Sequence, residues 1–558
     1  MLTQETRPYF HTLLDALVLT GEDETATAII FVATDAEPIV VSRAEFKTAV
    51  SHAAQQQAHH GIQAGDLVII AHQQNLEGIY AFWGALFIGA IPSMFPTLTE
   101  KLDPDIYMRD MAKLVELSGV KAILTSDAFA PVLAEHVDCA VFGDFDAGEQ
   151  GSRGEAVGKL IPNADEIAFL QHSSGTTGLK KGVALSHTAV LNQIASYSDA
   201  LRLNAKDVVV SWLPLYHDMG LIAGFMLPLL QGIPLVLMSP FDWVSRPALL
   251  LRAITEFEGT LCWLPNFAYN HCARRIRQRD KEGISLASMR AFINCSEPVR
   301  HDSHQLFLEK FAVHGLRPDM LGVSYAMAEN TFGVTQTMPH RPPILDVVDE
   351  QRLISEQIAH VVQPTHPHAA TKVSCGRPIS GTAVKIVDDA GNELPERHVG
   401  HIWVQSNCML TEYYKRSDLQ PFNEGWYETG DKGYLADGEL YVNGRTKDLI
   451  INAGKNVYPQ DLEAIVNEIE GVHAGRAVAF GVPDQKEGTE LIAIVAEVKT
   501  EEPDERKRIS SAIRQTIVKQ TAVSVTYVQL VAPKWLIKTS SGKIARAANR
   551  DKWLQDRG

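Results

Sequence analysis

A stretch rich in glycine, hydroxyl and lysine residues offers the clearest chemistry in the sequence. Ten residues hold three glycines, four hydroxyl side chains and two lysines: Ser173, Ser174, Gly175, Thr176, Thr177, Gly178, Leu179, Lys180, Lys181 and Gly182. Glycine lets the backbone turn through positive φ and approach a ligand closely, while N–H groups, hydroxyls and lysine bind phosphate oxygens. The stretch lies between two apolar runs and predicts a cradle for a polyphosphate.

Two other interpretations of this stretch carry different functions. A Walker-type ATPase loop ends in a Gly-Lys-Ser/Thr triplet, and no such triplet closes the stretch. A polar surface loop between strands is the simpler alternative, because loops rich in Gly, Ser and Thr are common. The paired lysines between apolar strands favour the phosphate cradle over the simple loop.

Six further motifs follow the cradle along the chain. They are Leu213–Gly220, Asn294–Val299, Ser324–Asn330, Trp426–Asp431, Gly444–Asp448 and Lys538–Ile544. In their types and order, the seven motifs resemble those of the adenylate-forming superfamily, which includes acyl-CoA synthetases, luciferases, peptide-synthetase adenylation domains and fatty acyl-AMP ligases. The resemblance covers essentially the whole chain. Asn294–Val299 is similar to the form found in fatty acyl-AMP ligases.

The resemblance implies a nucleotide and metal site. In family members an aromatic residue stacks on adenine and an acid holds Mg²⁺, roles that fall here on Tyr325 and Glu329, and a hard dication suits a carboxylate. Ser173 is a second candidate metal ligand, whereas the alternative for Glu329 is a plain surface acid. The implied nucleotide-binding set is Ser173, Ser174, Gly175, Thr176, Thr177, Gly178, Lys181, Ser296, Glu297, Pro298, Ser324, Tyr325, Asp431 and Arg445.

The same resemblance implies the catalytic and hinge residues. His217 would orient the substrate carboxylate, although a histidine in a loop bounded by Pro and Gly is more often structural. Asp431 would accept hydrogen bonds from the ribose hydroxyls, and Arg445 would contact the nucleotide. Asp448 would absorb a backbone rotation as the hinge, and Lys543 matches the family's adenylation lysine.

One motif departs from the family pattern. Ala326 and Ala328 stand where Gly and usually Thr occur, although Ala at 328 is also found among fatty acyl-AMP ligases. Ala328 lacks a hydroxyl that contacts the α-phosphate in other members. We expect Ser324 or the cradle to compensate.

Hydrophobic periodicity predicts the fold. Strand-like runs such as Leu67–Ala71 and Ala122–Thr125 alternate with helix-length amphipathic segments such as Arg43–His59, which indicates an α/β sheet. After Ser374 the runs become short and β-like, and another α/β unit begins at Arg445. We expect an α/β fold in which residues 1–444 form a large domain of two α/β subdomains and a β-rich subdomain. Residues 445–558 would form a small mobile α+β domain, and residues 339–372 an insertion.

Composition limits the function classes. The chain has 67 acidic and 51 basic residues and a net charge of −16, which argues against a nucleic-acid partner. Leu221–Met238 is uncharged, but its glycines and prolines predict a short helix, a turn and a strand and not a membrane span. The first residues lack the basic region of a signal peptide. The six cysteines show no paired CxxC spacing, which gives no indication of a zinc site or a disulfide framework. A cytoplasmic protein is expected.

The resemblance implies ATP-dependent activation of a carboxylic acid, most simply a fatty acid, to acyl-AMP with Mg²⁺ as cofactor. The acyl group would pass to the phosphopantetheine thiol of an acyl carrier protein, or alternatively to CoA. The long connection Pro339–Thr371 lies where fatty acyl-AMP ligases carry an insertion that resembles a brake on domain rotation. An inactive nucleotide-binding scaffold is the third alternative, and matches at Glu329, Asp431 and Lys543 argue against it.

Overall fold

The computed structural model describes residues 10–19, 23–99, 104–144, 163–172, 181–452, 455–484, 489–521, 523–539 and 542–557. Most of the cradle, Ser173–Lys180, lies outside these ranges.

A nine-stranded sheet forms the centre of the large domain. Its spatial order is β17 (Arg377–Pro378), β14 (Gly333–Gln336), β13 (Leu321–Ala326), β12 (Ala291–Asn294), β11 (Leu261–Leu264), β9 (Val209–Ser211), β10 (Leu235–Met238), β1 (Thr27–Val32) and β2 (Ile39–Ser42). The strands from β13 to β1 run parallel, and β17, β14 and β2 are antiparallel to their neighbours. Buried residues fill both faces of the parallel strands, as expected for a sheet covered by helices.

A second sheet of four parallel strands lies in the N-terminal part of the chain. Its order is β4 (Ile91–Met94), β3 (Leu67–Ile70), β5 (Ala122–Leu124) and β6 (Ala140–Phe142). All four residues of β3 are buried, which explains its continuous apolar sequence. A three-stranded sheet of β7 (Ile167–His172), β8 (Gly182–Ser186) and β20 (Glu412–Tyr413) contains the strands on either side of the cradle.

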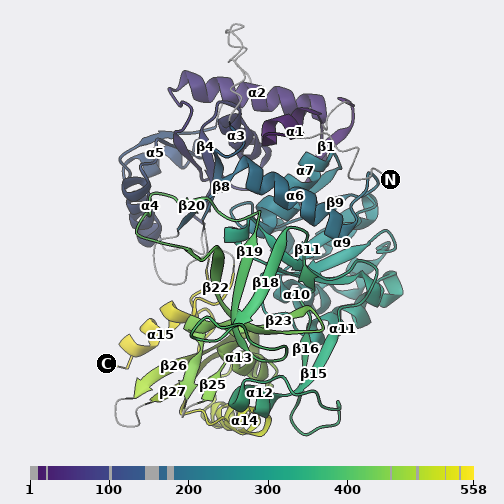
Figure 1. The fold of residues 1–558 in the computed structure, drawn as a ribbon, viewed down its shortest axis with the longest axis vertical. Coiled ribbons are helices and arrows are strands. Elements are labelled where there is room, and N and C mark those ends of the chain that lie inside the picture. Colours follow the sequence, from purple (N-terminus) through teal and green to yellow (C-terminus); the bar gives the residue numbers. More distant parts are fainter. Residues whose placement is uncertain are drawn as a thin grey trace.

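Helices cover these sheets, as Figure 1 shows for α2, α3 and α6. Those of the large domain are α1 (Leu13–Leu19), α2 (Arg43–His59), α3 (Leu76–Phe87), α4 (Pro104–Ser118), α5 (Ala130–Ala134), α6 (His187–Leu201), α7 (Leu227–Gln231), α8 (Pro240–Ser245), α9 (Ala248–Glu256), α10 (Asn266–Arg275) and α11 (His301–Phe311). A capping box between Ser42 and Glu45 fixes the start of α2, so the helix begins where the sequence predicts.

The predicted break of Leu221–Met238 into shorter elements is confirmed. A π-helical turn η2 (Met219–Met226) leads into α7, and a left-handed Gly232 separates α7 from β10. No helix of the described chain is long and apolar enough to cross a membrane.

The β-rich part of the chain forms a five-stranded sheet that lies between the upper and lower parts of the molecule (Figure 1). Its strands are β18 (Thr382–Val387), β19 (Gly400–Ser406), β21 (Phe422–Asn423), β22 (Trp426–Ala436) and β23 (Glu439–Arg445). Within the predicted insertion, β15 (Leu345–Asp349) and β16 (Ala369–Val373) pair antiparallel, and α12 (Glu350–Glu356) follows β15.

Residues after β23 pack around a hydrophobic core of their own. The elements are β24 (Ile450–Asn452), β25 (Lys455–Val457), α13 (Pro459–Asn467), β26 (Val472–Asp484), β27 (Thr489–Val498), α14 (Pro503–Thr521), β28 (Tyr527–Val531) and α15 (Arg546–Gln555). The mixed α/β fold with a large N-terminal and a small C-terminal domain is therefore confirmed. The boundary at residues 444 and 445 stays a prediction, which this separate core supports.

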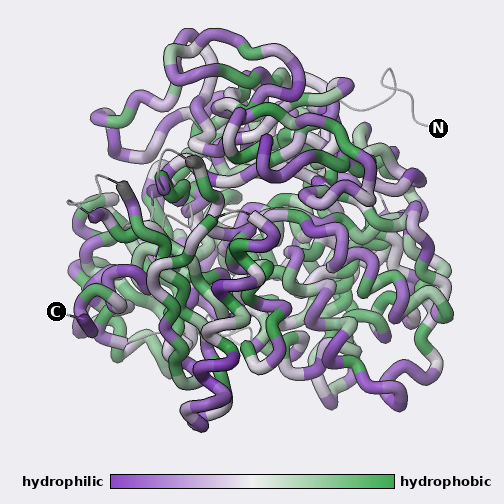
Figure 2. Tube along the Cα trace, turned by 90° about the horizontal axis from the view of Figure 1, so that it is seen from below, coloured by the Kyte–Doolittle hydropathy of each residue, from purple (hydrophilic) through white to green (hydrophobic). Residues whose placement is uncertain are grey.

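The hydropathy of the residues along the Cα trace differs between the interior and the outer parts of the molecule (Figure 2). In Figure 2, apolar segments run through the interior, and strongly hydrophilic stretches gather in the outer turns and helices.

Candidate active site

Three of the predicted motifs lie at the carboxyl ends of central parallel strands. The Leu213–Gly220 motif follows β9, Cys295–Pro298 follows β12, and Tyr325 is the next-to-last residue of β13. Ligands of open α/β sheets bind in the crevice outside these strand ends. The topology therefore brings together motifs that are spread over more than a hundred residues of the sequence.

A lysine from the C-terminal domain reaches this edge of the sheet. Lys543 Nζ donates a hydrogen bond of 2.7 Å to the backbone carbonyl of Ser296. Ser296 has a φ of 68°, an uncommon conformation for a residue with a side chain. Thr539 N–H donates to the Lys543 carbonyl at 2.8 Å, which holds the backbone of the lysine. Lys543 and the Asn294–Val299 motif thus meet directly.

The predicted nucleotide residues form a second cluster. Tyr325 donates its hydroxyl hydrogen to Asp431 Oδ2 at 2.6 Å, and Arg445 Nε lies 3.5 Å from Asp431 Oδ1. Asp431 and Arg445 are paired across β22 and β23. Burial raises the pKa of Asp431, while Arg445 and the Tyr325 hydrogen bond act against the shift. The carboxylate is therefore held between a cation and an aromatic hydroxyl.

The candidate metal ligand Glu329 has a tyrosine partner that sequence reasoning missed. Tyr413 donates its hydroxyl hydrogen to Glu329 Oε1 at 3.0 Å, and the Tyr427 hydroxyl lies 2.9 Å from that of Tyr413. Lys181, the described end of the cradle, places its ammonium 4.7 Å from the centre of the Tyr413 ring. No sequence pattern indicated this cluster, because it depends on the pairing of β20 with β8.

A second residue missed as a functional candidate is Asp218. It begins η2, where its carboxylate accepts the N–H of Met219 at 2.8 Å. Burial raises the pKa of Asp218, the Lys543 ammonium opposes this shift, and Glu329 adds to it. Asp218 belongs to the Leu213–Gly220 motif, but only the fold places it near Lys543.

The remaining predicted residues have mixed environments. His217 is half-buried, and the centre of its ring lies 4.9 Å from the centre of the Tyr216 ring. Glu297 accepts the N–H of Phe267 at 2.9 Å, and burial raises its pKa against the influence of Lys543. Pro298 is exposed beside it. Ser324 donates its hydroxyl to the Thr335 carbonyl at 2.8 Å, so that hydroxyl is engaged within the sheet.

The candidate hinge residue Asp448 is held inside the C-terminal domain. Arg546, three residues after Lys543, donates to Asp448 Oδ2 at 2.6 Å and to both carboxylate oxygens of Glu463 at 2.9 Å. One arginine, close in sequence to Lys543, therefore contacts the candidate hinge residue.

The described residues fit a magnesium ion that is shared with phosphates. They contain no group of three or more His, Cys, Asp or Glu able to hold a metal alone. The Glu329 carboxylate has two oxygens, and the Tyr413 bond uses only part of their accepting capacity. Mg²⁺ is commonly held by one or two carboxylates together with substrate phosphates and water. Ser173, the other candidate ligand, lies outside the described residues.

A family comparison agrees with this geometry. The model of the family described as AMP-binding enzyme matches residues 21–414. The chain belongs to the AMP-binding enzyme family. The resemblance to the adenylate-forming superfamily, predicted from the motifs, is thereby confirmed.

This AMP-binding enzyme has relatives that match along most of their length. It is 30% identical to the medium-chain-fatty-acid–[acyl-carrier-protein] ligase JamA of Moorena producens, covering 88% of this chain and 86% of the relative. It is 31% identical to the long-chain-fatty-acid–AMP ligase FadD32 of Mycolicibacterium smegmatis, covering 88% and 85%. A solved structure from work on fatty acyl-adenylate ligases of E. coli and L. pneumophila matches with a TM-score of 0.89, 26% identity and 98% coverage of both chains.

A cluster of charged residues lies where the predicted insertion, the large domain and the C-terminal domain of this AMP-binding enzyme meet. Lys372 Nζ lies 3.0 Å from Glu350 Oε2 in the insertion, and both side chains are largely buried. Nearby, Arg300 donates to the Gln460 carbonyl at 2.7 Å and lies 3.5 Å from Asp461. Asp461 and Arg300 also influence the ionisation of Glu350 and Lys372, so the four charges form one cluster.

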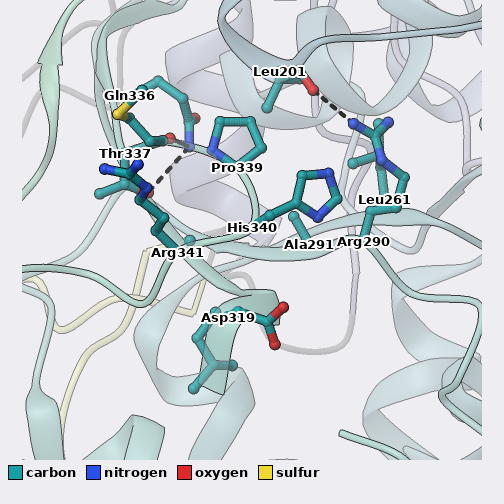
Figure 3. A pocket seen from close by; sticks show the side chains of 13 residues that line it. Leu201, Leu261, Arg290, Ala291, Asp319, Gln336, Thr337, Pro339, His340 and Arg341 are labelled. Atoms are coloured by element: carbon teal, nitrogen blue, oxygen red, sulfur yellow. Dashed lines mark hydrogen bonds between the residues drawn. The ribbon is translucent and has the colours of Figure 1, made fainter. Parts of the chain in front are cut away.

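One pocket lies away from the candidate site (Figure 3). It is lined by Leu261, Ala291 and Leu321, the first residues of β11, β12 and β13. Arg290 in this pocket donates to the Leu201 carbonyl at 3.0 Å (Figure 3). The pocket therefore occupies the opposite ends of the strands from Ser296 and Tyr325.

The raised pKa of Asp218 predicts a pH-dependent effect on stability. A raised pKa means that the folded protein holds the proton more tightly, so this stabilisation is present below the ordinary value of 3.8 and is lost as pH rises through the folded value. Asn cannot ionise. Relative to wild type, Asp218→Asn should therefore gain free energy of unfolding as pH rises from about 4 to about 8, measured by urea denaturation.

Glu116→Gln, at an exposed position of α4, serves as the control and should show no such trend. A difference between Asp218→Asn and wild type that stays constant or shrinks with rising pH would contradict the burial of an unfavourable charge at Asp218.

Proposed function

We propose that this AMP-binding enzyme activates a fatty acid with ATP to form acyl-AMP and pyrophosphate. It then transfers the acyl group to the phosphopantetheine thiol of an acyl carrier protein. The observation that carries the proposal is the contact of Lys543 with the Ser296 carbonyl, beside the cluster of Tyr325, Asp431 and Arg445. The fatty-acid ligases JamA and FadD32, to which this chain is similar, support the choice of a fatty acid.

The first step joins two anions, so the site must counter negative charge. A carboxylate oxygen of the acid attacks the α-phosphorus of ATP, a new P–O bond forms, and the bond to pyrophosphate breaks. The nucleophile is already ionised, so no general base is required. Lys543 contributes a positive charge near the reacting phosphate, and a preorganised cation is most effective in a site that excludes water.

The other residues of the site bind and orient the reactants. Asp431 would accept the ribose hydroxyls, and the Tyr325 ring would contact adenine. Glu329 and Ser173 would hold Mg²⁺, which supplies charge neutralisation on the phosphates when bound. His217 would orient the acid, and the Ser173–Gly178 cradle with Lys181 would contact the phosphates.

The contacts around the insertion bear on whether a carrier protein or free CoA accepts the acyl group. Arg300 of the large domain donates to the Gln460 carbonyl and lies 3.5 Å from Asp461 in the C-terminal domain, beside the buried Lys372–Glu350 pair of the insertion. This attachment restrains a rotation that transfer to free CoA would use, and supports a carrier protein as the acceptor. Transfer to CoA remains the second candidate. An inactive scaffold would have no need for the Lys543 contact.

Lys543→Met should slow the chemical step while leaving ATP binding nearly intact. Loss of one transition-state charge contact costs about 10² to 10³ in rate. Pyrophosphate release in a rapid-quench experiment measures the step, and calorimetry measures ATP affinity, which should change less than about threefold.

Lys519→Ala, an exposed lysine of α14 in the same domain, is the matched control and should keep the wild-type rate. Equal losses in rate and ATP affinity for Lys543→Met would argue against its role in the chemical step.

The acceptor is tested by product analysis. Purified protein receives a panel of fatty acids, ATP and Mg²⁺, with CoA and a phosphopantetheinylated carrier protein offered in parallel. Mass spectrometry should detect acyl-AMP and predominantly acyl-carrier protein. Acyl-CoA formed as readily as acyl-carrier protein would favour the CoA alternative, and absence of pyrophosphate release with every acid would favour the scaffold.

A further inference from the structure

We propose that Tyr413 is a positioning residue that orients the Glu329 carboxylate toward a divalent cation, and that Tyr427 in turn orients Tyr413. The inference rests on the proposed function, because it takes Glu329 as the acid that faces the metal and phosphates. Neither tyrosine belongs to the residues that the motifs assign to the site.

The hydrogen-bond direction follows from the chemistry of the three groups. An ionised carboxylate only accepts, so Tyr413 must give its single hydroxyl hydrogen to Glu329 Oε1. The Tyr413 oxygen can then only accept from Tyr427, whose hydroxyl lies 2.9 Å away. The three side chains therefore form a relay with one direction, from Tyr427 through Tyr413 to Glu329.

Burial makes this relay rigid. Tyr413 and Tyr427 are only 6% and 7% exposed, so water has little access to compete for their hydroxyls. Lys181 lies above the Tyr413 ring, with the ammonium 4.7 Å from its centre, a cation–π arrangement. The ring and the hydroxyl of one tyrosine thus contact the end of the cradle and the candidate metal ligand at the same time.

The backbone fixes Tyr413 between the same two features. Tyr413 pairs with Val183 across β20 and β8, directly after the cradle. Leu410, three residues earlier, donates its N–H to the Glu329 carbonyl at 2.8 Å. The short segment from Leu410 to Tyr413 therefore sets the distance between the strand that follows the cradle and the backbone of Glu329.

A tyrosine is a suitable partner for a carboxylate that must serve a cation. Its neutral hydroxyl fixes the orientation of the carboxylate but leaves the negative charge in place, whereas Lys or Arg would neutralise it. Hydrogen bonds from such neighbouring groups orient metal ligands, and their loss typically weakens metal affinity. The geometry assigns this role to Tyr413.

Magnesium-dependent nucleotide binding tests the assignment without relying on turnover. Calorimetry with α,β-methylene ATP, a non-reacting analogue, gives the factor by which Mg²⁺ strengthens binding. Tyr413→Phe keeps the ring over Lys181 but removes the hydroxyl, and should reduce this factor about tenfold. Binding without Mg²⁺ should change less than about twofold, since uniform binding contacts remain.

A double-mutant cycle tests the relay. Tyr427→Phe should reduce the magnesium factor less than Tyr413→Phe does. The double variant should behave like Tyr413→Phe alone, because Tyr427 acts through Tyr413. Tyr434→Phe is the matched control: its hydroxyl donates to Asp346 at 2.8 Å, a tyrosine–carboxylate bond toward the insertion, and its loss should leave the magnesium factor unchanged.

Three results would overturn the inference. The first is a magnesium factor for Tyr413→Phe equal to that of Tyr434→Phe. The second is a matching loss of binding without Mg²⁺, which indicates general disruption of the site. The third is a double variant whose loss of the magnesium factor equals the combined losses of Tyr413→Phe and Tyr427→Phe. Wild-type protein without magnesium-dependent binding would instead contradict the proposed function itself, and this inference with it.

Discussion

The contact of the Lys543 ammonium with the Ser296 carbonyl is the interaction on which the site depends. It joins the C-terminal domain to the carboxyl edge of the central sheet and places a cation beside two acids with burial-raised pKa values, Asp218 and Glu297. Without it, the site would keep Arg445 and Lys181 but lose one of the positive charges that a reaction between two anions needs. Arg546, three residues after Lys543, donates a hydrogen bond to Asp448. The position of Lys543 is therefore coupled to the candidate hinge.

Local charge in the site differs from the charge of the whole chain. The chain carries a net charge of −16, yet it is proposed to bind ATP and a carboxylate, both anions. Lys543, Arg445 and Lys181 provide the local positive charge, and Asp431 and Glu329 lie among them. Interactions of this kind are strongest where the groups are buried, because solvent and salt screen them little. The overall acidity therefore does not decide which ligand the site can hold.

The helices, strands and motifs can be predicted from the sequence, whereas the contacts between them cannot. The helix Arg43–His59 was predicted with its observed bounds, because its capping box and periodicity are local signals. Tyr413 was missed because its role comes from the pairing of β20 with β8, which are more than two hundred residues apart. Ser324, expected to help replace a missing hydroxyl, donates to Thr335 inside the sheet, a bond that no sequence pattern reveals. The roles of the cradle residues Ser173–Lys180 stay predictions.

Affinity labelling tests most directly whether Lys543 lies at the nucleotide. A 5′-fluorosulfonylbenzoyl adenosine places an electrophile where the ATP phosphates would lie, and peptide mapping identifies the lysine that it modifies. The account predicts modification of Lys543 and protection by ATP with Mg²⁺. Modification confined to other lysines, or labelling of Lys543 that ATP does not reduce, would contradict the claim that this lysine meets the nucleotide at the sheet edge.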